Sequence, residues 1–327
     1  MTNRVAVTFE LDAAGRGIIA EALGSAADIV SLAKLDEAAR AATLRQAAAL
    51  IAGNPLKELR AHELPLLGHM KLVQLLAAGI DFIRMDQLPP GVPVASNAGA
   101  YAEPMAEHAL AMALAAAKRL LVEHEELRQG RFNQRGLNRM LAGGVCGILG
   151  FGGVGVAAAR LMRCVGMRVH AINRRGATEE PVDWIGSPAQ LDTLLRAADV
   201  LLVVAPLTRA TVGMIGAREL RLMREDTTLI NLARGEIIDE AALFQHLQAH
   251  PRFTACIDAW WVEPVRHGEF RMDQPFMRLP NVIASPHNSA SVAATPAAGL
   301  RQAAANCRRA LLGERVEHLI GPDDRFL

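Results

Sequence analysis

The sequence predicts an α/β protein with two doubly wound parallel sheets, one in each of two domains. Short apolar runs alternate with helical patterns along most of the chain, which is the order of parallel strands joined by crossover helices. Aromatic residues make up only 4% of the chain while Ala, Leu and Val are frequent, which favours helices packed on parallel strands over an all-β sandwich. The length of 327 residues corresponds to roughly two domains at about 150 residues each.

The first hundred residues form one such series. Apolar runs of strand length occur at Val5–Phe9, Ala27–Leu32, Ala47–Ala52, Lys71–Ala77, Phe82–Met85 and Val92–Ser96. Helical patterns occupy Ala13–Leu23 and Leu35–Arg45, and Pro89-Pro90-Gly91 marks a turn. This region predicts a parallel sheet with helices on both faces.

A long Ala-rich helical pattern, Tyr101–Leu121, separates this series from the next. We expect one continuous helix there. A helix of this length between two βα regions usually connects domains or forms an interface, and a core helix is the alternative.

A second βα series begins at Val145. Its expected strands are Val145–Leu149, Arg168–Ile172, Val200–Val204, Thr228–Leu232, Thr254–Asp258 and Val282–Ala284. Its expected helices are Val154–Val165, Leu191–Ala197, Ala217–Met223 and Glu240–His250, with a last helix at Ala293–Leu312. Six strands with crossovers of this length match a six-stranded doubly wound sheet. The polar tail, Gly321–Leu327, is expected on the surface.

Composition and charge exclude several classes of protein. Hydrophobic residues make up 51% and charged residues 21%, which excludes disorder. With 35 basic and 34 acidic residues, no global basic field exists to hold nucleic acid or an anionic membrane. The most apolar run, Ala109–Ala117, is much shorter than the roughly 20 residues of a membrane-spanning helix. We expect neither a nucleic acid nor a membrane partner.

The cysteines and the N-terminus bear on compartment and metals. The four cysteines show no CxxC motif and no metal-type pairing with His: Cys146, Cys164, Cys256 and Cys307. We therefore expect no metal site and reduced thiols in a cytoplasmic protein. Glu10 interrupts the N-terminus before an apolar secretion signal could form.

Gly150-Phe-Gly-Gly-Val-Gly155 lies between a predicted strand and a predicted helix, where a dinucleotide-binding loop belongs. Gly150 permits the tight turn, Gly152 lets the backbone approach a pyrophosphate, and Gly155 lets the helix pack on the strand. The helix N-terminus supplies N–H donors to the anion, so we include Gly153 and Val154 in the cofactor site. A tight βα turn without a ligand is the alternative.

The end of the second strand bears on the choice of cofactor. An NAD site expects Asp or Glu there to bind the ribose hydroxyls, but the chain has Asn173 followed by Arg174 and Arg175. No carboxylate repels a 2′-phosphate, and two guanidiniums can bind it. We predict a preference for NADP(H), with NAD(H) possible. Two solvated loop arginines are the alternative.

Polar residues also follow three later strands. Arg234 lies just past one strand, Asp258 and Glu263 follow the next, and His287 follows the last. Ligands of an open α/β sheet bind outside the carboxyl ends of the strands, so these side chains can converge on a nicotinamide. Reduction of a ketone needs a proton on oxygen, which a His can supply. Glu263 would orient the ring of His287 and favour its protonated form, and Arg234 can hold a substrate carboxylate.

Together these stretches resemble the D-isomer-specific 2-hydroxyacid dehydrogenase family. The resemblance covers about Leu72 to Gly313. It rests on Val73–Asp81, Ala106–Leu110, Gly147–Gly155, Pro206–Gly213, Ile230–Asp239, Asp258–Pro264 and Ser285–His287.

The resemblance implies a discontinuous, flavodoxin-like substrate domain of residues 1–98 and 290–327. A Rossmann dinucleotide-binding domain, residues 99–289, is inserted into it. The resemblance also implies that Arg234, Glu263 and His287 are catalytic and that Asp258 contacts the nicotinamide amide.

The remaining contacts are implied by the same resemblance. The substrate would be bound by backbone N–H groups of Ala77, Ala78 and Gly79, with Arg234 and His287. Further cofactor contacts would come from Ala205, Pro206, Leu232, Ala233, Arg234 and His287. The family's usual homodimer forms through the cofactor domain, using a long helix like Tyr101–Leu121.

Within the family, Asn173-Arg-Arg resembles NADP-using glyoxylate/hydroxypyruvate reductases, so we expect a reductase of small 2-ketoacids. Formate dehydrogenases carry Gln at the position of Glu263, which argues against a formate- or phosphite-type dehydrogenase. A corepressor-like scaffold of the same fold is a further alternative, and the balanced charge argues against it. Tyr101 either lines the substrate pocket or only packs.

Overall fold

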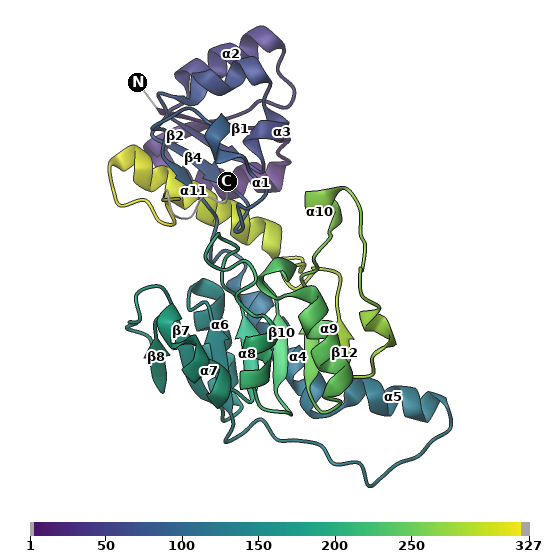
Figure 1. The fold of residues 1–327 in the computed structure, drawn as a ribbon. Coiled ribbons are helices and arrows are strands. Elements are labelled where there is room, and N and C mark those ends of the chain that lie inside the picture. Colours follow the sequence, from purple (N-terminus) through teal and green to yellow (C-terminus); the bar gives the residue numbers. More distant parts are fainter. Residues whose placement is uncertain (1–2, 322–327) are drawn as a thin grey trace. The chain divides into compact units, whose positions relative to one another are not determined.

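The computed structural model describes residues 3–321, so the tail expected on the surface lies outside the described residues beyond Gly321. The chain forms two compact units (Figure 1). The terminal unit consists of Met1–Tyr101 and Val292–Leu327, and the central unit consists of Ala102–Ser291. No helix within residues 3–321 is long and apolar enough to cross a membrane.

The terminal unit is built on a parallel sheet with five strands among its described residues, in the order β2-β1-β3-β4-β5. The strands are β1 (Asn3–Val7), β2 (Ala27–Ser31), β3 (Ala49–Ala52), β4 (Leu72–Leu75) and β5 (Val94–Ala95). The helices are α1 (Ala13–Leu23), α2 (Glu37–Gln46), α3 (Pro55–Glu58) and α11 (Thr295–Leu312). This strand order is the flavodoxin-like one, so the predicted doubly wound sheet is confirmed.

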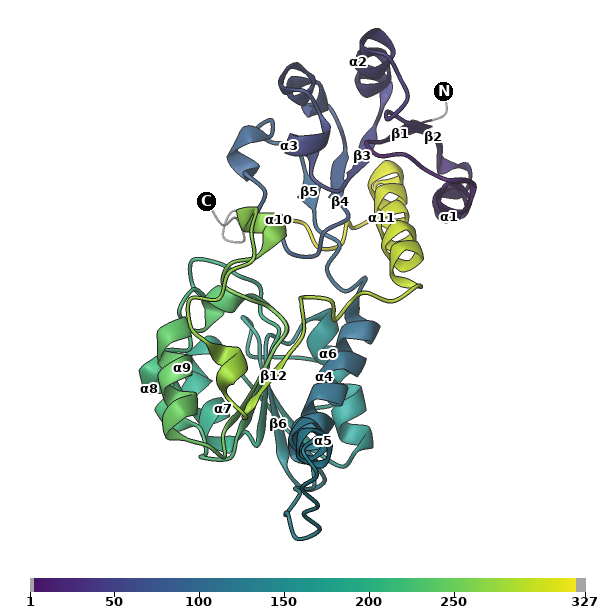
Figure 2. The same cartoon turned by 90° about the vertical axis from the view of Figure 1, so that its right-hand side faces the viewer.

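Local sequence explains where these helices begin. The Asp12 carboxylate accepts the Gly15 N–H at 2.7 Å and starts α1, and Asp36 accepts the Ala39 N–H at 2.8 Å and starts α2. α11 comes from the other end of the chain and packs along α1 (Figure 2). Its buried Cys307 belongs to the same apolar cluster as residues of β1 and β4, so the two ends of the chain share one core.

One strand expected in this unit is wrong. Phe82–Met85 begins as a turn in which the Ile83 N–H donates to the Ile80 carbonyl at 3.0 Å, and a 3-10 turn follows at Met85–Gln87. Ile83 and Met85 are nevertheless buried in the core of the unit. The apolar pattern therefore reports a buried loop and not a strand.

The central unit contains a parallel sheet with seven strands among the described residues, in the order β12-β11-β10-β9-β6-β7-β8. The strands are β6 (Val145–Leu149), β7 (Arg168–Ile172), β8 (Trp184–Gly186), β9 (Val200–Val203), β10 (Thr228–Asn231), β11 (Thr254–Ile257) and β12 (Val282–Ala284). The first six in chain order follow the Rossmann arrangement. All the predicted strands are present, but the expected total of six is one too low. The sequence pattern missed β8, which lies between Pro181 and Pro188 without a distinct apolar run and is a strand through its pairing with β7.

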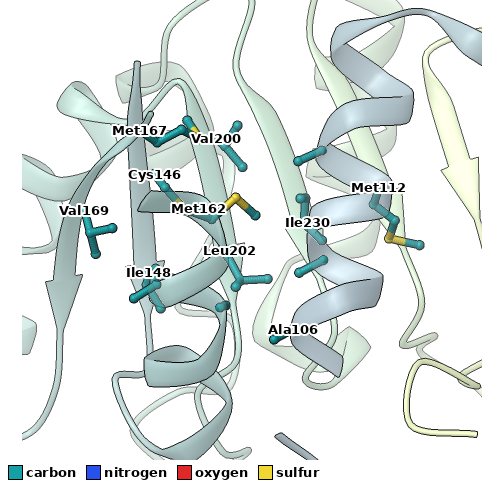
Figure 3. Packing of buried hydrophobic residues seen from close by; sticks show 14 of the residues in the cluster. Ala106, Met112, Cys146, Ile148, Met162, Met167, Val169, Val200, Leu202 and Ile230 are labelled. Carbon is teal, nitrogen blue, oxygen red and sulfur yellow. The ribbon is translucent and has the colours of Figure 1, made fainter. Parts of the chain in front are cut away.

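Helices cover both faces of this sheet (Figure 2). On one face lie α7 (Leu191–Ala197), α8 (Ala217–Leu222) and α9 (Glu240–Ala249), and on the other α4 (Ala102–Ala117) and α6 (Gly153–Cys164). The short α10 (Pro264–His267) lies between β11 and β12 in the chain. In the core, Ile148, Leu202 and Ile230 of the sheet pack with Met112 of α4 and Met162 of α6 (Figure 3).

The continuous helix expected at Tyr101–Leu121 is wrong. α4 ends at Ala117, Arg119 has a left-handed φ of 51°, and α5 (Leu120–Arg128) follows. The returning chain explains the break, because the Arg139 N–H donates to the Ala117 carbonyl at 2.9 Å. The Lys118 ammonium donates to the Arg139 carbonyl at 2.8 Å. A distant segment thus satisfies the helix end.

Candidate active site

The glycine loop connects β6 to α6. Gly150 has a φ of 106°, and a Cβ there would lie 2.4 Å from the backbone nitrogen of Ala205. A Cβ at Gly155 would lie 2.5 Å from the Gly150 carbonyl oxygen. In contrast, nothing lies within 4 Å of a Cβ built at Gly152, the N-cap of α6. The loop is therefore closed towards the protein and open at the helix N-terminus, a cradle that fits a pyrophosphate.

Two further cofactor candidates adjoin this loop. Ala205 and Pro206 follow β9, which is the neighbour of β6 in the sheet. The Gly150–Ala205 approach brings them to the glycine loop, at the point where the strand order reverses. Gly153 and Val154 begin α6, where backbone N–H groups have no partner inside the helix.

The turn after β7 carries the residues expected to select the cofactor. The Asn173 side chain shapes the turn: its Nδ2 donates to the Ala177 carbonyl at 2.9 Å, and its Oδ1 accepts the Arg175 N–H at 3.0 Å. Arg174 and Arg175 are exposed. The predicted absence of a carboxylate here is thus accompanied by an Asn that holds the turn.

Leu232, Ala233 and Arg234 form the turn after β10. The Asn231 side chain organises it, because Oδ1 accepts the Ala233 N–H at 3.0 Å and Nδ2 donates to the Arg234 carbonyl at 2.9 Å. The Arg234 guanidinium donates to the Ala233 carbonyl at 2.8 Å. Leu232 and Ala233 are buried, so the turn that carries Arg234 is fixed against the core.

The Trp260–Trp261 pair, which sequence reasoning did not use, supports this arrangement. A Cβ at Gly235 would lie 2.5 Å from the Trp261 backbone nitrogen, so only glycine lets the two turns meet. The Trp261 indole donates to the Ile238 carbonyl at 2.7 Å. The Trp260 indole donates to the Ser285 carbonyl at 2.9 Å. Adjacent tryptophans in one short motif were the signal for this role.

Asp258 is completely buried at the end of β11. Its Oδ1 accepts the Ser285 hydroxyl at 2.5 Å and the Asn288 N–H at 3.1 Å. Its Oδ2 accepts the Ser289 N–H at 3.3 Å, and its carbonyl accepts the His287 N–H at 2.9 Å. Asp258 thus ties the end of β11 to the loop after β12.

The structure brings Glu263 and His287 together. Nδ1 of His287 lies 2.8 Å from each Glu263 carboxylate oxygen. The Glu263 side chain is 8% exposed and that of His287 is 34% exposed, so the pair is covered on the carboxylate side and open on the imidazole side. Oε1 of Glu263 also accepts the Trp260 N–H at 2.7 Å.

Electrostatics keep this carboxylate ionised. Burial raises the pKa of Glu263. The hydrogen bonds from His287 and from the Trp260 N–H lower it by more, and the positive charge of Arg234 lowers it further. The net pKa of Glu263 lies below its usual value. Arg234, Glu263 and His287 therefore form one electrostatically coupled group at the carboxyl edge of the sheet.

The expected substrate loop belongs to the terminal unit and follows β4. The Asn97 N–H donates to the Ala77 carbonyl at 2.9 Å. The Tyr101 hydroxyl donates to the Leu76 carbonyl at 2.5 Å, so Tyr101 fixes the start of the Ala77–Gly79 segment. Ala78 is exposed. Within the described part of the chain, no cluster of three or more His, Cys, Asp or Glu side chains could hold a metal ion.

A family model for the NAD binding domain of D-isomer specific 2-hydroxyacid dehydrogenases matches residues 110–289. The chain is 30% identical over 228 residues to a hydroxypyruvate reductase of Thermotoga maritima, a match that covers 69% of this chain and 72% of that protein. It is 30% identical over 227 residues to a glyoxylate reductase of Thermococcus gammatolerans, covering 67% and 66%. It is also 30% identical over 226 residues to a D-3-phosphoglycerate dehydrogenase of Archaeoglobus fulgidus, covering 68% of this chain but only 42% of that protein.

Solved structures show the same fold. A candidate formate dehydrogenase from Pyrobaculum aerophilum aligns over 100% of both chains with a TM-score of 0.78 and 26% identity. A D-isomer specific 2-hydroxyacid dehydrogenase from Xanthobacter autotrophicus, solved with NADPH and MES, aligns over 98% of this chain and 99% of that one, with a TM-score of 0.79 and 24% identity. The family model covers more than half of the chain, and one relative at 30% identity matches across more than two thirds of both proteins. This chain therefore belongs to the D-isomer specific 2-hydroxyacid dehydrogenase family of NAD(P)-dependent oxidoreductases.

Proposed function

We propose that the protein is an NADP(H)-preferring reductase that converts a small 2-ketoacid, of the glyoxylate or hydroxypyruvate type, into the D-2-hydroxyacid. One observation carries the proposal. An ionised, buried carboxylate, that of Glu263, holds His287 by a hydrogen bond and interacts with the charge of Arg234, at the carboxyl edge of the sheet that also carries the glycine loop. An imidazole held in this way can donate and accept a proton, and a guanidinium can bind a carboxylate.

The proposed mechanism assigns one task to each side chain. Because the Glu263 carboxylate accepts the proton on Nδ1, Nε2 is the atom of His287 that exchanges a proton with substrate. In ketone reduction the imidazolium gives its Nε2 proton to the carbonyl oxygen, and Glu263 stabilises the imidazolium beforehand. Arg234 binds the substrate carboxylate and polarises the carbonyl next to it. The reduced nicotinamide, when bound, supplies the hydride to the carbonyl carbon.

The cofactor contacts follow from the same edge of the sheet. The N-terminal end of α6, Gly152–Val154, would hold the pyrophosphate. Oδ2 of Asp258 accepts the Ser289 N–H at 3.3 Å, and the second lone pair of this oxygen can accept an N–H of the nicotinamide amide. Ala205, Pro206, Leu232 and Ala233 would line the same crevice. The exposed Arg174 and Arg175, with no carboxylate at 173, support a preference for a 2′-phosphate.

The domains have separate tasks in this proposal. The central unit carries the cofactor site and the three catalytic side chains. The terminal unit carries the Ala77–Gly79 backbone, which would bind the substrate carboxylate. A cytoplasmic location is supported by the four cysteines, which are all free thiols.

We propose that a second copy of the chain covers α5 and the segment after it. Apolar side chains there are strongly exposed: Leu120 55%, Leu121 50%, Leu127 57%, Phe132 74%, Leu137 90% and Met140 77%. Patches of this kind on a soluble fold mark protein interfaces. Light scattering should show a dimer for the wild type and a monomer for Phe132→Asp/Leu137→Asp. A monomeric wild type would contradict the homodimer.

The proposed activity is tested by one substrate panel. The purified protein is incubated with NADPH or NADH and glyoxylate, hydroxypyruvate, pyruvate or phenylpyruvate, and with NADP+ or NAD+ and formate or phosphite. We expect NADPH oxidation with a small 2-ketoacid. Turnover of formate or phosphite alone would favour the class of the Pyrobaculum aerophilum neighbour. NADPH binding without turnover of any compound would favour the scaffold alternative.

A further inference from the structure

We propose that His108 is a positioning residue, which acts through Ser285 and Asp258 on the loop that carries His287. The inference rests on the function proposed above. His108 lies on α4 and not at the end of a strand, and nothing in the proposed mechanism uses it.

A chain of hydrogen bonds leads from this histidine to the catalytic loop. Nε2 of His108 lies 3.1 Å from the Ser285 hydroxyl oxygen, which lies 2.5 Å from Oδ1 of Asp258. The same carboxylate accepts the N–H groups of Asn288 and Ser289 at 3.1 and 3.3 Å. These two amides follow His287 directly in the chain.

The directions of these hydrogen bonds assign a proton. A serine hydroxyl has one proton to donate, and a carboxylate only accepts. The Ser285 proton therefore points to Asp258, and the Ser285 oxygen accepts from His108. His108 must then carry a proton on Nε2, and its donation holds the serine rotamer that serves Asp258.

The loop needs such support for two reasons. Asp258 is completely buried, so each donor to its carboxylate offsets part of a desolvation cost. His287 has a left-handed φ of 51°, a conformation that a non-glycine residue keeps only when its surroundings impose it. Asp258 holds this backbone conformation through two groups. Its carbonyl accepts the His287 N–H, and its carboxylate accepts the N–H groups of the next two residues, Asn288 and Ser289. Without His108 the serine can turn away, and the hold on the loop weakens.

Three variants test this chain. His108→Ala removes the donor, His108→Gln replaces it with an amide N–H of similar reach, and His69→Ala removes an exposed histidine of the terminal unit as the matched control. The first readout needs no activity: amide hydrogen exchange at Asn288 and Ser289 in the cofactor-free protein. We expect exchange about tenfold faster in His108→Ala, which corresponds to about 1.4 kcal/mol of local opening, and wild-type rates in the other two variants. Unchanged rates in His108→Ala would overturn the proposal.

The second readout is steady-state kinetics with the best 2-ketoacid. We expect kcat to fall on the order of 10- to 100-fold in His108→Ala, because a displaced acid group loses reactive geometry, with the ketoacid KM changed much less. His108→Gln should keep most of the wild-type kcat. Loss of activity in both variants would point to a structural histidine and contradict a positioning role. A wild type that turns over no ketoacid would refute the proposed function while the exchange result still stands.

A third readout covers the case in which His108→Ala does not fold. Nitrogen-15 NMR of the wild type must show a proton on Nε2 of His108, and a bare Nε2 would overturn the assignment. Ser285→Ala should then reproduce the faster exchange at Asn288 and Ser289. Wild-type exchange rates in Ser285→Ala would overturn the proposal.

Discussion

Nδ1 of His287 lies 2.8 Å from both carboxylate oxygens of Glu263. Because the Trp260 N–H also donates to Oε1 at 2.7 Å, the carboxylate cannot rotate freely and the imidazole is aligned on it. The opposite ring nitrogen, Nε2, therefore has a defined direction, which a proton donor needs.

Removal of the imidazole should abolish most catalysis. We expect His287→Ala to lower kcat by roughly 10²–10⁴-fold, the size of lost general acid–base catalysis, with NADPH affinity largely kept. His287→Asn separates the chemistry from the backbone, because Asn tolerates the left-handed φ of 51° at this position. Stopped-flow turnover and NADPH titration measure both effects, and wild-type turnover in either variant would refute the assignment.

Neutralising the carboxylate should change the pH dependence of the reaction. Glu263 is ionised at neutral pH because hydrogen bonds lower its pKa against the effect of burial. In Glu263→Gln no negative charge stabilises the imidazolium that donates the proton. We expect lower kcat and an alkaline limb of the kcat–pH profile for ketoacid reduction that moves to lower pH. A kcat–pH profile that keeps its wild-type position would show that Glu263 does not stabilise the protonated form of His287.

The cofactor preference should depend on the turn after β7. We expect Arg174→Ala/Arg175→Ala to raise the KM for NADPH by about 10- to 100-fold, the equivalent of one or two charge-assisted hydrogen bonds, and to leave the KM for NADH nearly unchanged. Arg16→Ala, an exposed arginine on α1, is the control. An equal rise in the KM for NADPH and for NADH would contradict binding of a 2′-phosphate by these arginines.

Two glycines of the same loop should respond differently to alanine. A Cβ at Gly150 would lie 2.4 Å from the Ala205 nitrogen at a φ of 106°, so Gly150→Ala should lower the unfolding free energy by about 1–3 kcal/mol or more. Gly152 has a φ of −107° and open space, so Gly152→Ala should keep its Tm and lose NADPH affinity. Calorimetry and fluorescence titration test the pair. Wild-type NADPH affinity in Gly152→Ala would show that the pyrophosphate does not bind at the N-terminus of α6.

A buried ion pair should dominate the acid stability of the terminal unit. Arg40 donates to both oxygens of Glu63 at 2.7 Å, and the hydrogen bond from Arg40 holds the pKa of Glu63 below its usual 4.5. We expect Glu63→Gln to cost about 3–5 kcal/mol at pH 7, because it leaves the buried Arg40 charge unpaired. Glu37→Gln, which breaks an exposed pair with Arg60, should cost under about 1 kcal/mol.

The sign of the pH effect follows from that lowered pKa. The contribution of Glu63 is complete above its unfolded-state pKa and disappears as the pH falls through the lower folded-state value. The difference between wild type and Glu63→Gln in urea titrations should therefore be constant near neutrality and shrink below pH 4.5. A difference that grows on acidification would contradict the pairing.

Much of the fold could be predicted because its signals are local. Apolar runs of three to five residues predicted β6, β7 and β12 at the bounds that the structure shows, and the helical pattern Ala13–Leu23 predicted α1 at its bounds. The elements that the sequence pattern did not predict correctly depend on contacts between distant parts of the chain. The end of α4 depends on Arg139, which lies about 20 residues along the chain, and β8 is a strand chiefly because β7 pairs with it.

The sequence by itself determined the doubly wound sheets, the glycine loop and which polar residues follow the strands, because strand period, glycine spacing and strand ends are all readable along the chain. Only the tertiary structure decided that Glu263 and His287, on different turns, share a hydrogen bond, and that His108 joins Asp258 through Ser285. The reason is physical: hydrogen bonds act over about 3 Å, and only packing brings residues separated by 24 or 177 positions within that range.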